Sequence, residues 1–268
     1  MARASRHYLP GNHIWHITHR CHKREFLLKF ARDRRNWIRW LFEAKKRYGL
    51  CVLNYMVTSN HIHLLVDDKG EGMIPRSIQL IAGRTAQDYN RRKKRKGAFW
   101  EDRYHATAVQ ADSHILQCML YIDINMVRAG MAGHPSEWAF CGYNEIQKPP
   151  QRYSIIDRKR LMELVDVGVG DELSRAYNGW VDEILRSSEP TRQSKWTESV
   201  AVGNMQFIGK VRGELGMRAA GRDIIKSGGG YELRDPGVSY SHVFGVKNDT
   251  LSPENTYFWD FYSKSSVT

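Results

Sequence analysis

Residues 50–66 read LCVLNYMV, then TSN, then HIHLLV, and this stretch carries the clearest structural signal in the chain. The two outer runs are rich in β-branched and large apolar residues, and the short polar run between them is typical of a tight turn. We therefore predict a β-hairpin. Because residues i and i+2 of a strand point to the same side, His61 and His63 lie side by side while the alternate apolar residues face a core.

Hydrophobic periodicity extends this pattern in both directions along the chain. The spacing of the apolar residues predicts strands over 13–18 and 104–110, and helices over 31–48, 75–96 and 114–129. The resulting order, β-α-β-β-α-β-α, favours an α+β fold in which helices pack on an antiparallel β-sheet.

The pair Pro149-Pro150 marks a linker or a chain crossing. We therefore divide the chain into a first domain, residues 1–150, and a C-terminal extension of unclear role, residues 151–268. Helical spacing over 158–185 and 199–215 predicts that the extension is mostly helical.

The net excess of positive charge lies entirely in the first of these two parts. The chain of 268 residues has a formal net charge of +12, and residues 1–150 hold 25 Lys+Arg against 13 Asp+Glu, whereas the remaining 118 residues hold 16 of each. A strongly basic half indicates a polyanionic partner such as nucleic acid.

The chain lacks both an apolar run long enough to span a membrane and the apolar segment of a signal peptide at its N-terminus. We expect a cytoplasmic bacterial protein with no membrane partner, associated with the nucleoid when it is bound to DNA. The cysteines have no metal-binding spacing, so we predict reduced, buried thiols at all four positions: Cys21, Cys51, Cys118 and Cys141.

Two adjacent imidazoles on a rigid strand make half of a site for a divalent cation. His61 and His63 fit that description, although a short H-x-H motif is also compatible with two polar residues on a solvent-facing strand.

The predicted helix 114–129 carries a polar stripe formed by Gln117, Tyr121, Asn125 and Arg128. The amide oxygen of Asn125 could complete a site for a hard cation, and the hydroxyl of Tyr121 could act as a nucleophile. The alternative is that Tyr121 is an ordinary half-buried helix residue.

Residues 91–96 read RRKKRK and are followed by aromatic residues at 99, 100 and 104. Such a run suits a nucleic-acid backbone, and aromatic rings can stack on unpaired bases. The simpler interpretation of the charged run is a solvated, flexible loop. For each aromatic ring, the simpler interpretation is packing in the core.

The H-x-H strand, followed about 60 residues later by a helix with Tyr-x-x-x-Asn, resembles the HUH single-tyrosine transposases. The runs YIDINMVRAG (121–130), FWEDRYH (99–105) and PSEW (135–138) resemble more specifically the REP-associated tyrosine transposases. The resemblance covers about residues 8–145 and is weaker in the extension.

Two positions depart from the family's usual pattern without removing a ligand. Met126 stands where the family often has proline, and Thr58-Ser59 stand where it often has Met-Pro.

The resemblance implies the ferredoxin/RRM-like core of HUH nucleases. It also implies that His61, His63 and Asn125 bind Mg²⁺ or Mn²⁺, while Tyr121 attacks a phosphate of single-stranded or hairpin DNA. The products would be a 5′-phosphotyrosine and a 3′-hydroxyl, so a second 3′-hydroxyl could reverse the step and rejoin the DNA. We predict that DNA phosphates are bound by Arg84, Arg91, Arg92, Lys93, Lys94, Arg95, Lys96 and Arg128.

Two other functions remain open from the sequence. One is a domesticated, non-catalytic protein that binds single-stranded nucleic acid, and the other is a metal-dependent phosphodiesterase in which water attacks. Related transposases include dimers and forms that act alone, so a homodimer is an open expectation.

Overall fold

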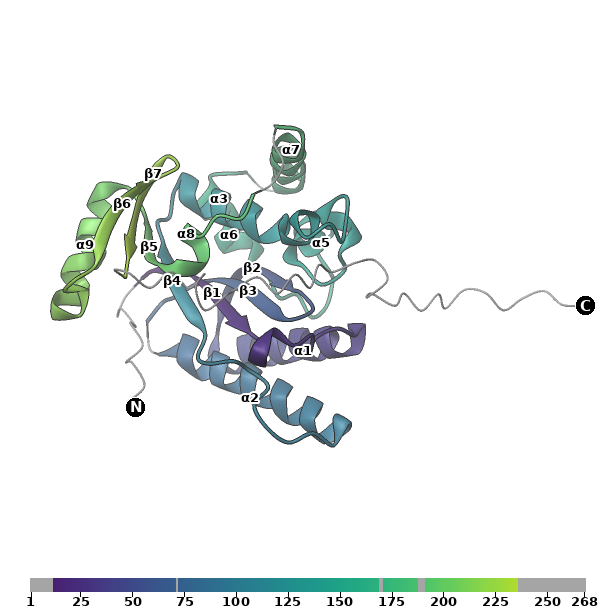
Figure 1. The fold of residues 1–268 in the computed structure, drawn as a ribbon. Helices are drawn as coiled ribbons and strands as arrows, with labels where there is room; N and C mark the ends of the chain where they lie inside the picture. The colour runs from purple at the N-terminus through teal and green to yellow at the C-terminus, as the bar shows by residue number, and fades with distance from the viewer. Residues whose placement is uncertain (1–11, 71, 169–170, 188–190, 236–268) are drawn as a thin grey trace, which may run out of the picture.

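A single seven-stranded β-sheet forms the centre of the computed structural model, which describes residues 12–70, 72–168, 171–187 and 191–235 (Figure 1). The strand order is β2-β3-β1-β4-β5-β7-β6. The strands are β1 (Ile14–Arg20), β2 (Cys51–Val57), β3 (His61–Asp67), β4 (His105–Val109), β5 (Ser199–Gly203), β6 (Asp223–Ser227) and β7 (Gly230–Arg234).

The predicted hairpin is present as β2 and β3, which pair antiparallel across the turn 58–60. Strand β1 lies beside β3 and pairs with β4 on its other edge, antiparallel in both cases. Every residue of β2 is buried, as are all those of β3 except His61. The predicted α+β class with a mainly antiparallel sheet is therefore confirmed.

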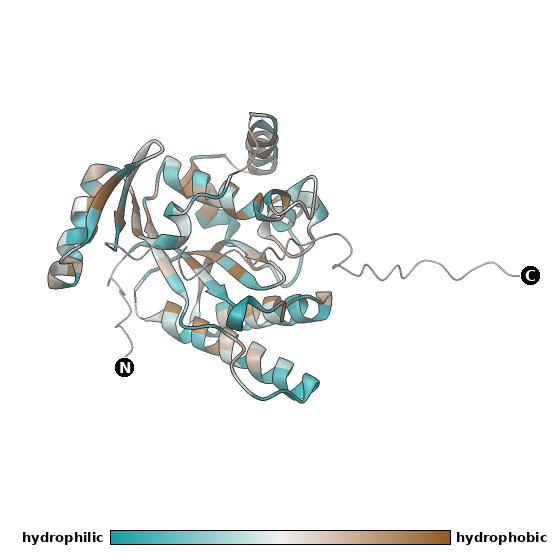
Figure 2. Cartoon of the chain, viewed as in Figure 1, coloured by the Kyte–Doolittle hydropathy of each residue, from teal (hydrophilic) through white to brown (hydrophobic). Residues whose placement is uncertain are grey.

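Two long helices, α1 and α2, pack against each other and cover one face of the sheet (Figure 1). Figure 2 shows hydrophilic residues concentrated along α1 and at the C-terminal end of α2. Helix α1 has the predicted bounds and ends at Gly49, whose φ of 68° is the left-handed conformation common at helix C-termini. The helices of the first 150 residues are α1 (Ala31–Tyr48), α2 (Met73–Lys93), α3 (Ser113–Asp123), α4 (Asn125–Arg128) and α5 (Gly142–Gln147), with short 3₁₀ turns η1 (His22–Arg24) and η2 (Pro135–Glu137).

The C-terminal part continues the same sheet. Strand β5 pairs parallel with β4, and β7 and β6 then extend the sheet in antiparallel order. The helix predicted over 199–215 is wrong in its first turn, because residues 199–203 are the fully buried strand β5. Its sequence, SVAVG, suits a strand buried on both faces. The helices here are α6 (Arg158–Val165), α7 (Glu172–Ser187), α8 (Lys195–Glu198) and α9 (Met205–Leu215), followed by η3 (Gly216–Ala219).

The helix predicted over 158–185 is two helices, α6 and α7, separated by a break that begins at Asp166 in a left-handed conformation. The boundary at residue 150 stays a prediction, and residues 236–268 of the predicted extension lie outside the described residues. Among the helices that the structure describes, none is both long and apolar enough to span a membrane. All four cysteines are buried and unpaired, as predicted.

Candidate active site

One face of the sheet is polar where β3, β1 and β4 lie side by side. Residues paired across adjacent strands point to the same face, and the register pairs Thr18 with both His63 and His105. Residues two positions apart share that face as well. This polar face therefore carries four histidines: His16, His61, His63 and His105.

His63 is buried and makes a hydrogen bond through each ring nitrogen. Its Nδ1 lies 2.9 Å from Nε2 of His16, and its Nε2 lies 2.9 Å from the amide nitrogen of Asn125. Burial, together with the neighbouring histidines, lowers the pKa of His63 well below 6.5. The ring is therefore neutral at physiological pH.

His61 stands next to His63 with a ring-centroid separation of 5.0 Å and is half-buried. Its Nδ1 lies 2.7 Å from Oδ1 of Asn60 and 3.0 Å from the hydroxyl of Thr58. Since the Asn60 oxygen can only accept, Nδ1 of His61 carries the proton and its Nε2 keeps a lone pair. Burial lowers the pKa of His61 to about 3, and the positive charge of Arg20 adds to that shift.

The predicted helix 114–129 begins as expected, because the Asp112 side chain accepts a hydrogen bond from the backbone N–H of His114. It is not continuous, since α3 ends at Asp123 and α4 begins at Asn125. Backbone hydrogen bonding from residue i to i−4 nevertheless persists across Ile124, so the chain keeps its helical direction through the break.

Tyr121 is only 4 % exposed and lies among aromatic rings. Its ring centroid is 5.9 Å from that of His63, 6.2 Å from that of His16 and 6.3 Å from that of Trp196. The guanidinium carbon of Arg128 lies 4.5 Å from the centre of the Tyr121 ring. The structure thus brings Tyr121 and Arg128 to the cluster that contains His63 and Asn125.

Burial and the nearby positive charges shift the pKa of Tyr121 in opposite directions. Burial raises the pKa of the phenol above 10, while the positive charges of Arg128 and Arg192 lower it. Nη1 of Arg128 is buried and has no hydrogen-bond partner among the described residues. The rest of this guanidinium interacts with Tyr121, and its unused Nη1 donor is suited to an incoming anion such as a phosphate.

The predicted phosphate-binding run 91–96 is helical in its first half, because α2 continues through Lys93, and its last three residues follow the helix. Arg92 forms an ion pair with the buried Asp33, and Arg95 donates to the carbonyl of Ala98 at 2.8 Å. Both side chains therefore have structural partners. The exposed members of the run are Arg91, Lys93, Lys94 and Lys96.

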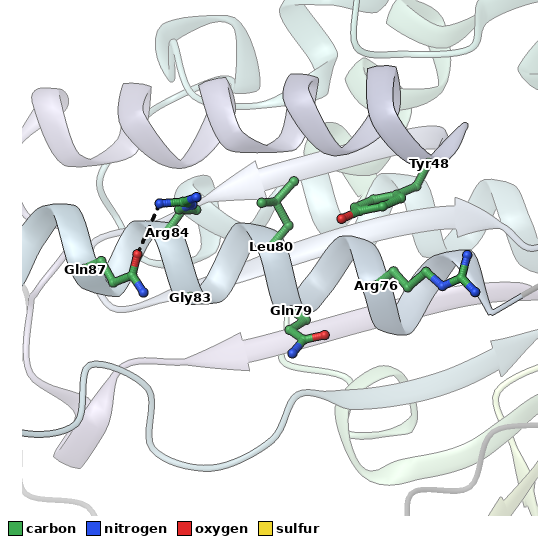
Figure 3. Close-up of a pocket in the computed structure, with 7 residues that line it drawn as sticks. All are labelled: Tyr48, Arg76, Gln79, Leu80, Gly83, Arg84 and Gln87. Carbon is green, nitrogen blue, oxygen red and sulfur yellow. Dashed lines mark hydrogen bonds between the residues drawn. The ribbon is translucent and has the colours of Figure 1, made fainter.

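Arg84 belongs to a shallow groove of about 330 Å³ between α2 and the end of α1 (Figure 3). Its guanidinium carbon lies 5.5 Å from the centre of the Trp40 ring, and the groove also contains Tyr48 and Arg76. Because α1 and α2 cover the other face of the sheet, the structure does not bring Arg84 to Tyr121.

Sequence reasoning missed His16, His105 and Trp196. The alternation over 13–18 places His16 and Thr18 on one face of a strand, and this signal could have identified His16 as part of a polar face. Trp196 comes from a segment distant in sequence, and no local pattern marks it.

The donor set of His61, His63 and Asn125 contains two neutral imidazoles and one amide. Among the described residues, no group of three or more His, Cys, Asp or Glu side chains could hold a metal ion. A site here would therefore depend on the amide oxygen of Asn125 as the third donor. Both imidazoles carry a lone pair on Nε2, and that of His63 accepts from the amide nitrogen of Asn125. Together with the amide oxygen of Asn125, these neutral donors fit a divalent cation.

The first half of the chain matches the family model described as "Transposase IS200 like" over residues 11–125. A REP-associated tyrosine transposase bound to a REP hairpin is 18% identical, with 55% of this chain and 85% of that chain covered and a TM-score of 0.43. A proposed transposase from Deinococcus radiodurans R1 is 17% identical, with 40% and 86% covered and a TM-score of 0.32.

No significant match is found among curated proteins. The matched residues 11–125 include both histidines of the H-x-H strand, Tyr121 and Asn125. Residues 11–125 of this chain are therefore similar to the IS200-like transposase family.

Proposed function

We propose that the chain is a metal-dependent endonuclease and strand transferase that cleaves and rejoins single-stranded or hairpin DNA, with Tyr121 as nucleophile. The observation that carries this proposal is the cluster in which His63 and Arg128 lie against the Tyr121 ring and Asn125 contacts His63. Its members come from a strand and from a helix about 60 residues later, and each has chemistry that phosphoryl transfer requires.

In this proposal His61, His63 and Asn125 hold Mg²⁺ or Mn²⁺, which would polarise the scissile phosphate when bound. The Tyr121 oxygen attacks phosphorus as its phenolic proton leaves, and the bond from phosphorus to the 3′-oxygen breaks. That oxygen takes up a proton to become a 3′-hydroxyl, and the 5′-phosphate stays on Tyr121. A second 3′-hydroxyl reverses the step and frees the phenol.

Arg128 has two roles in this scheme. Its positive charge lowers the pKa of Tyr121 against the effect of burial, and its unpartnered Nη1 would bind a non-bridging phosphate oxygen. His61 is more exposed than His63, so the solvent-accessible side of the cluster lies next to the turn 58–60.

Tyr121 lies against His63 of its own chain, and this contact supports a site completed in cis. A homodimer stays a prediction, and size-exclusion chromatography with light scattering tests it. The basic residues Arg91, Lys93, Lys94 and Lys96 are exposed, and we propose that they bind DNA phosphates outside the cluster.

The test is a gel assay with an end-labelled hairpin oligonucleotide that carries a single-stranded extension. With Mn²⁺ we expect a covalent protein–DNA adduct on a denaturing gel, and Tyr121→Phe should abolish it. Tyr143→Phe is the matched control, because Tyr143 is a buried tyrosine whose hydroxyl bonds to Asn178.

The rival functions give different products. A water-attacking phosphodiesterase yields free phosphate ends without an adduct, and a non-catalytic binder shifts the DNA on a native gel without cleaving it. An adduct that survives Tyr121→Phe would show that the nucleophile is another residue.

A further inference from the structure

Residues 191–199 contribute backbone groups to the polar face of the sheet. The carbonyl of Trp196 lies 2.8 Å from Nδ1 of His16 and 3.3 Å from the hydroxyl of Thr107. The carbonyl of Ser199 accepts from the same hydroxyl at 2.6 Å and lies 3.0 Å from Nε2 of His105. A segment far along the chain thus contacts the histidine cluster through its main chain.

These contacts fix the position of each imidazole proton. A carbonyl oxygen can only accept, so Nδ1 of His16 carries its proton and donates to Trp196. His16 is fully buried and neutral, so its Nε2 has only a lone pair, and it accepts from the Nδ1–H of His63. His63 in turn has no proton on Nε2, and the lone pair of this nitrogen accepts from the Asn125 amide.

The two rings are also held in orientation. His16 and His63 stack with an interplanar angle of 8° and a centroid separation of 5.1 Å. Trp196, whose carbonyl anchors the chain of hydrogen bonds, is itself completely buried. The buried main chain at residue 196 can therefore hold the two imidazole rings in a fixed orientation.

We propose that His16, held by the carbonyl of Trp196, is a positioning residue that keeps His63 in the tautomer with its lone pair on Nε2. This inference rests on the proposed function, in which that nitrogen binds a divalent cation. It assigns the segment around residue 196, in the C-terminal extension, a part in building the site. A hydrogen-bond partner on the other nitrogen of a metal-binding imidazole fixes the orientation of the ring. Loss of such a partner typically lowers metal affinity by about 10–100-fold.

The experiment uses the full-length protein and Mn²⁺ alone, and free Mn²⁺ is measured by electron paramagnetic resonance. We expect His16→Leu to weaken Mn²⁺ binding by about 10-fold or more. His16→Gln should stay within about threefold of the wild type, because its amide can donate to Trp196 and its oxygen can accept from His63.

His19→Leu is the matched control. His19 lies on the same strand, is buried, and bonds through Nε2 to the carbonyl of Asp102 at 2.8 Å. Its side chain points to the opposite face of the sheet, so this variant should lose stability without losing Mn²⁺ affinity. A purely structural role for His16 predicts instead that the two leucine variants behave alike.

Nitrogen-15 spectra of the histidine side chains supply a second readout that needs no metal. In the wild type we expect His63 to carry its proton on Nδ1, and in His16→Leu to show a mixture of tautomers. A wild-type His63 with its proton on Nε2 overturns the proposal, and this measurement suffices if His16→Leu does not fold.

The outcomes separate this inference from the proposed function. If the wild type binds Mn²⁺ and His16→Leu binds it equally well, the positioning role is wrong and the metal site stands. If the wild type does not bind Mn²⁺, the metal assignment fails and the role of His16 fails with it.

Discussion

Removal of Arg92 tests whether the basic run 91–96 is uniformly a DNA-binding element. The sequence predicts a phosphate contact for every residue of the run, but the structure pairs Arg92 with Asp33. The Asp33 side chain is 6 % exposed and that of Arg92 is 25 % exposed. Oδ2 of Asp33 has no hydrogen-bond partner among the described residues. Arg92→Ala would therefore leave a buried carboxylate without its cation.

The size of the effect follows from the burial of this pair. Removing one partner of a fully buried pair costs about 3–5 kcal/mol, whereas an exposed pair contributes about 0–1 kcal/mol. Since a quarter of the Arg92 side chain is exposed, we expect a loss of about 2 kcal/mol in the free energy of unfolding. That corresponds to a decrease in Tm of roughly 4–8 °C for a chain of this length.

The loss of stability caused by Arg92→Ala should increase as the pH rises. Burial raises the pKa of Asp33 above 3.8 and Arg92 opposes that rise, so Arg92→Ala raises the folded-state pKa further. A carboxyl whose folded pKa exceeds its unfolded pKa destabilises the fold progressively as pH rises between the two values. The Tm difference between variant and wild type should therefore be larger at pH 8 than at pH 4, close to the ordinary pKa of the carboxyl.

Thermal unfolding and salt-dependent hairpin binding together form the assay. Arg91→Ala is the control, because Arg91 is exposed and makes no ion pair in the described part of the chain. It should leave Tm nearly unchanged and reduce the salt slope of binding by about one charge. Arg92→Ala should do the reverse, and Asp33→Asn should recover stability in the double variant. A reduced salt slope with an unchanged Tm for Arg92→Ala would refute this reasoning.

Three further predictions concern packing, thiol reactivity and catalysis. Gly142→Ala should destabilise the fold by about 1–3 kcal/mol, because its Cβ would lie 2.1 Å from Oδ1 of the buried Asn54; an unchanged Tm would contradict this. Burial raises the pKa of all four thiols, that of Cys51 to about 12, so a chromogenic disulfide reagent should react no faster than the chain unfolds. Arg128→Gln should slow adduct formation in a single-turnover assay by about 10²-fold or more and should weaken hairpin binding by no more than the loss of one phosphate contact. A rate within twofold of the wild type would remove Arg128 from the mechanism.

Local sequence patterns were sufficient to predict those helices and strands whose main contacts are with residues close in sequence. The period-two pattern around His61 predicted the hairpin, and the spacing over 31–48 gave α1 its observed bounds. The four-residue spacing of Tyr121 and Asn125 placed both beside His63, even though the helix breaks at Ile124.

Features that depend on distant contacts could not be read from such patterns. The short run 199–203 adjoins helical spacing in the sequence, and only its pairing with β4 makes it a strand. The ion pair that occupies Arg92 lies between residues 59 positions apart. Burial of Tyr121 is likewise a tertiary property, since Trp196 comes from another part of the chain.

The parallel pairing of β4 with β5 also governs when the chain can fold. His105 and Ser199, which meet across this pair, are 94 residues apart, and such contacts form late because a long loop must close first. At about 5–20 residues per second, a ribosome needs roughly 5–20 s to synthesise the intervening segment. Throughout that time β4 is an edge strand with unpaired backbone groups, which is the kind of surface that recruits other chains. Growing chains and fragments that end before residue 191 should therefore be the aggregation-prone forms of this protein.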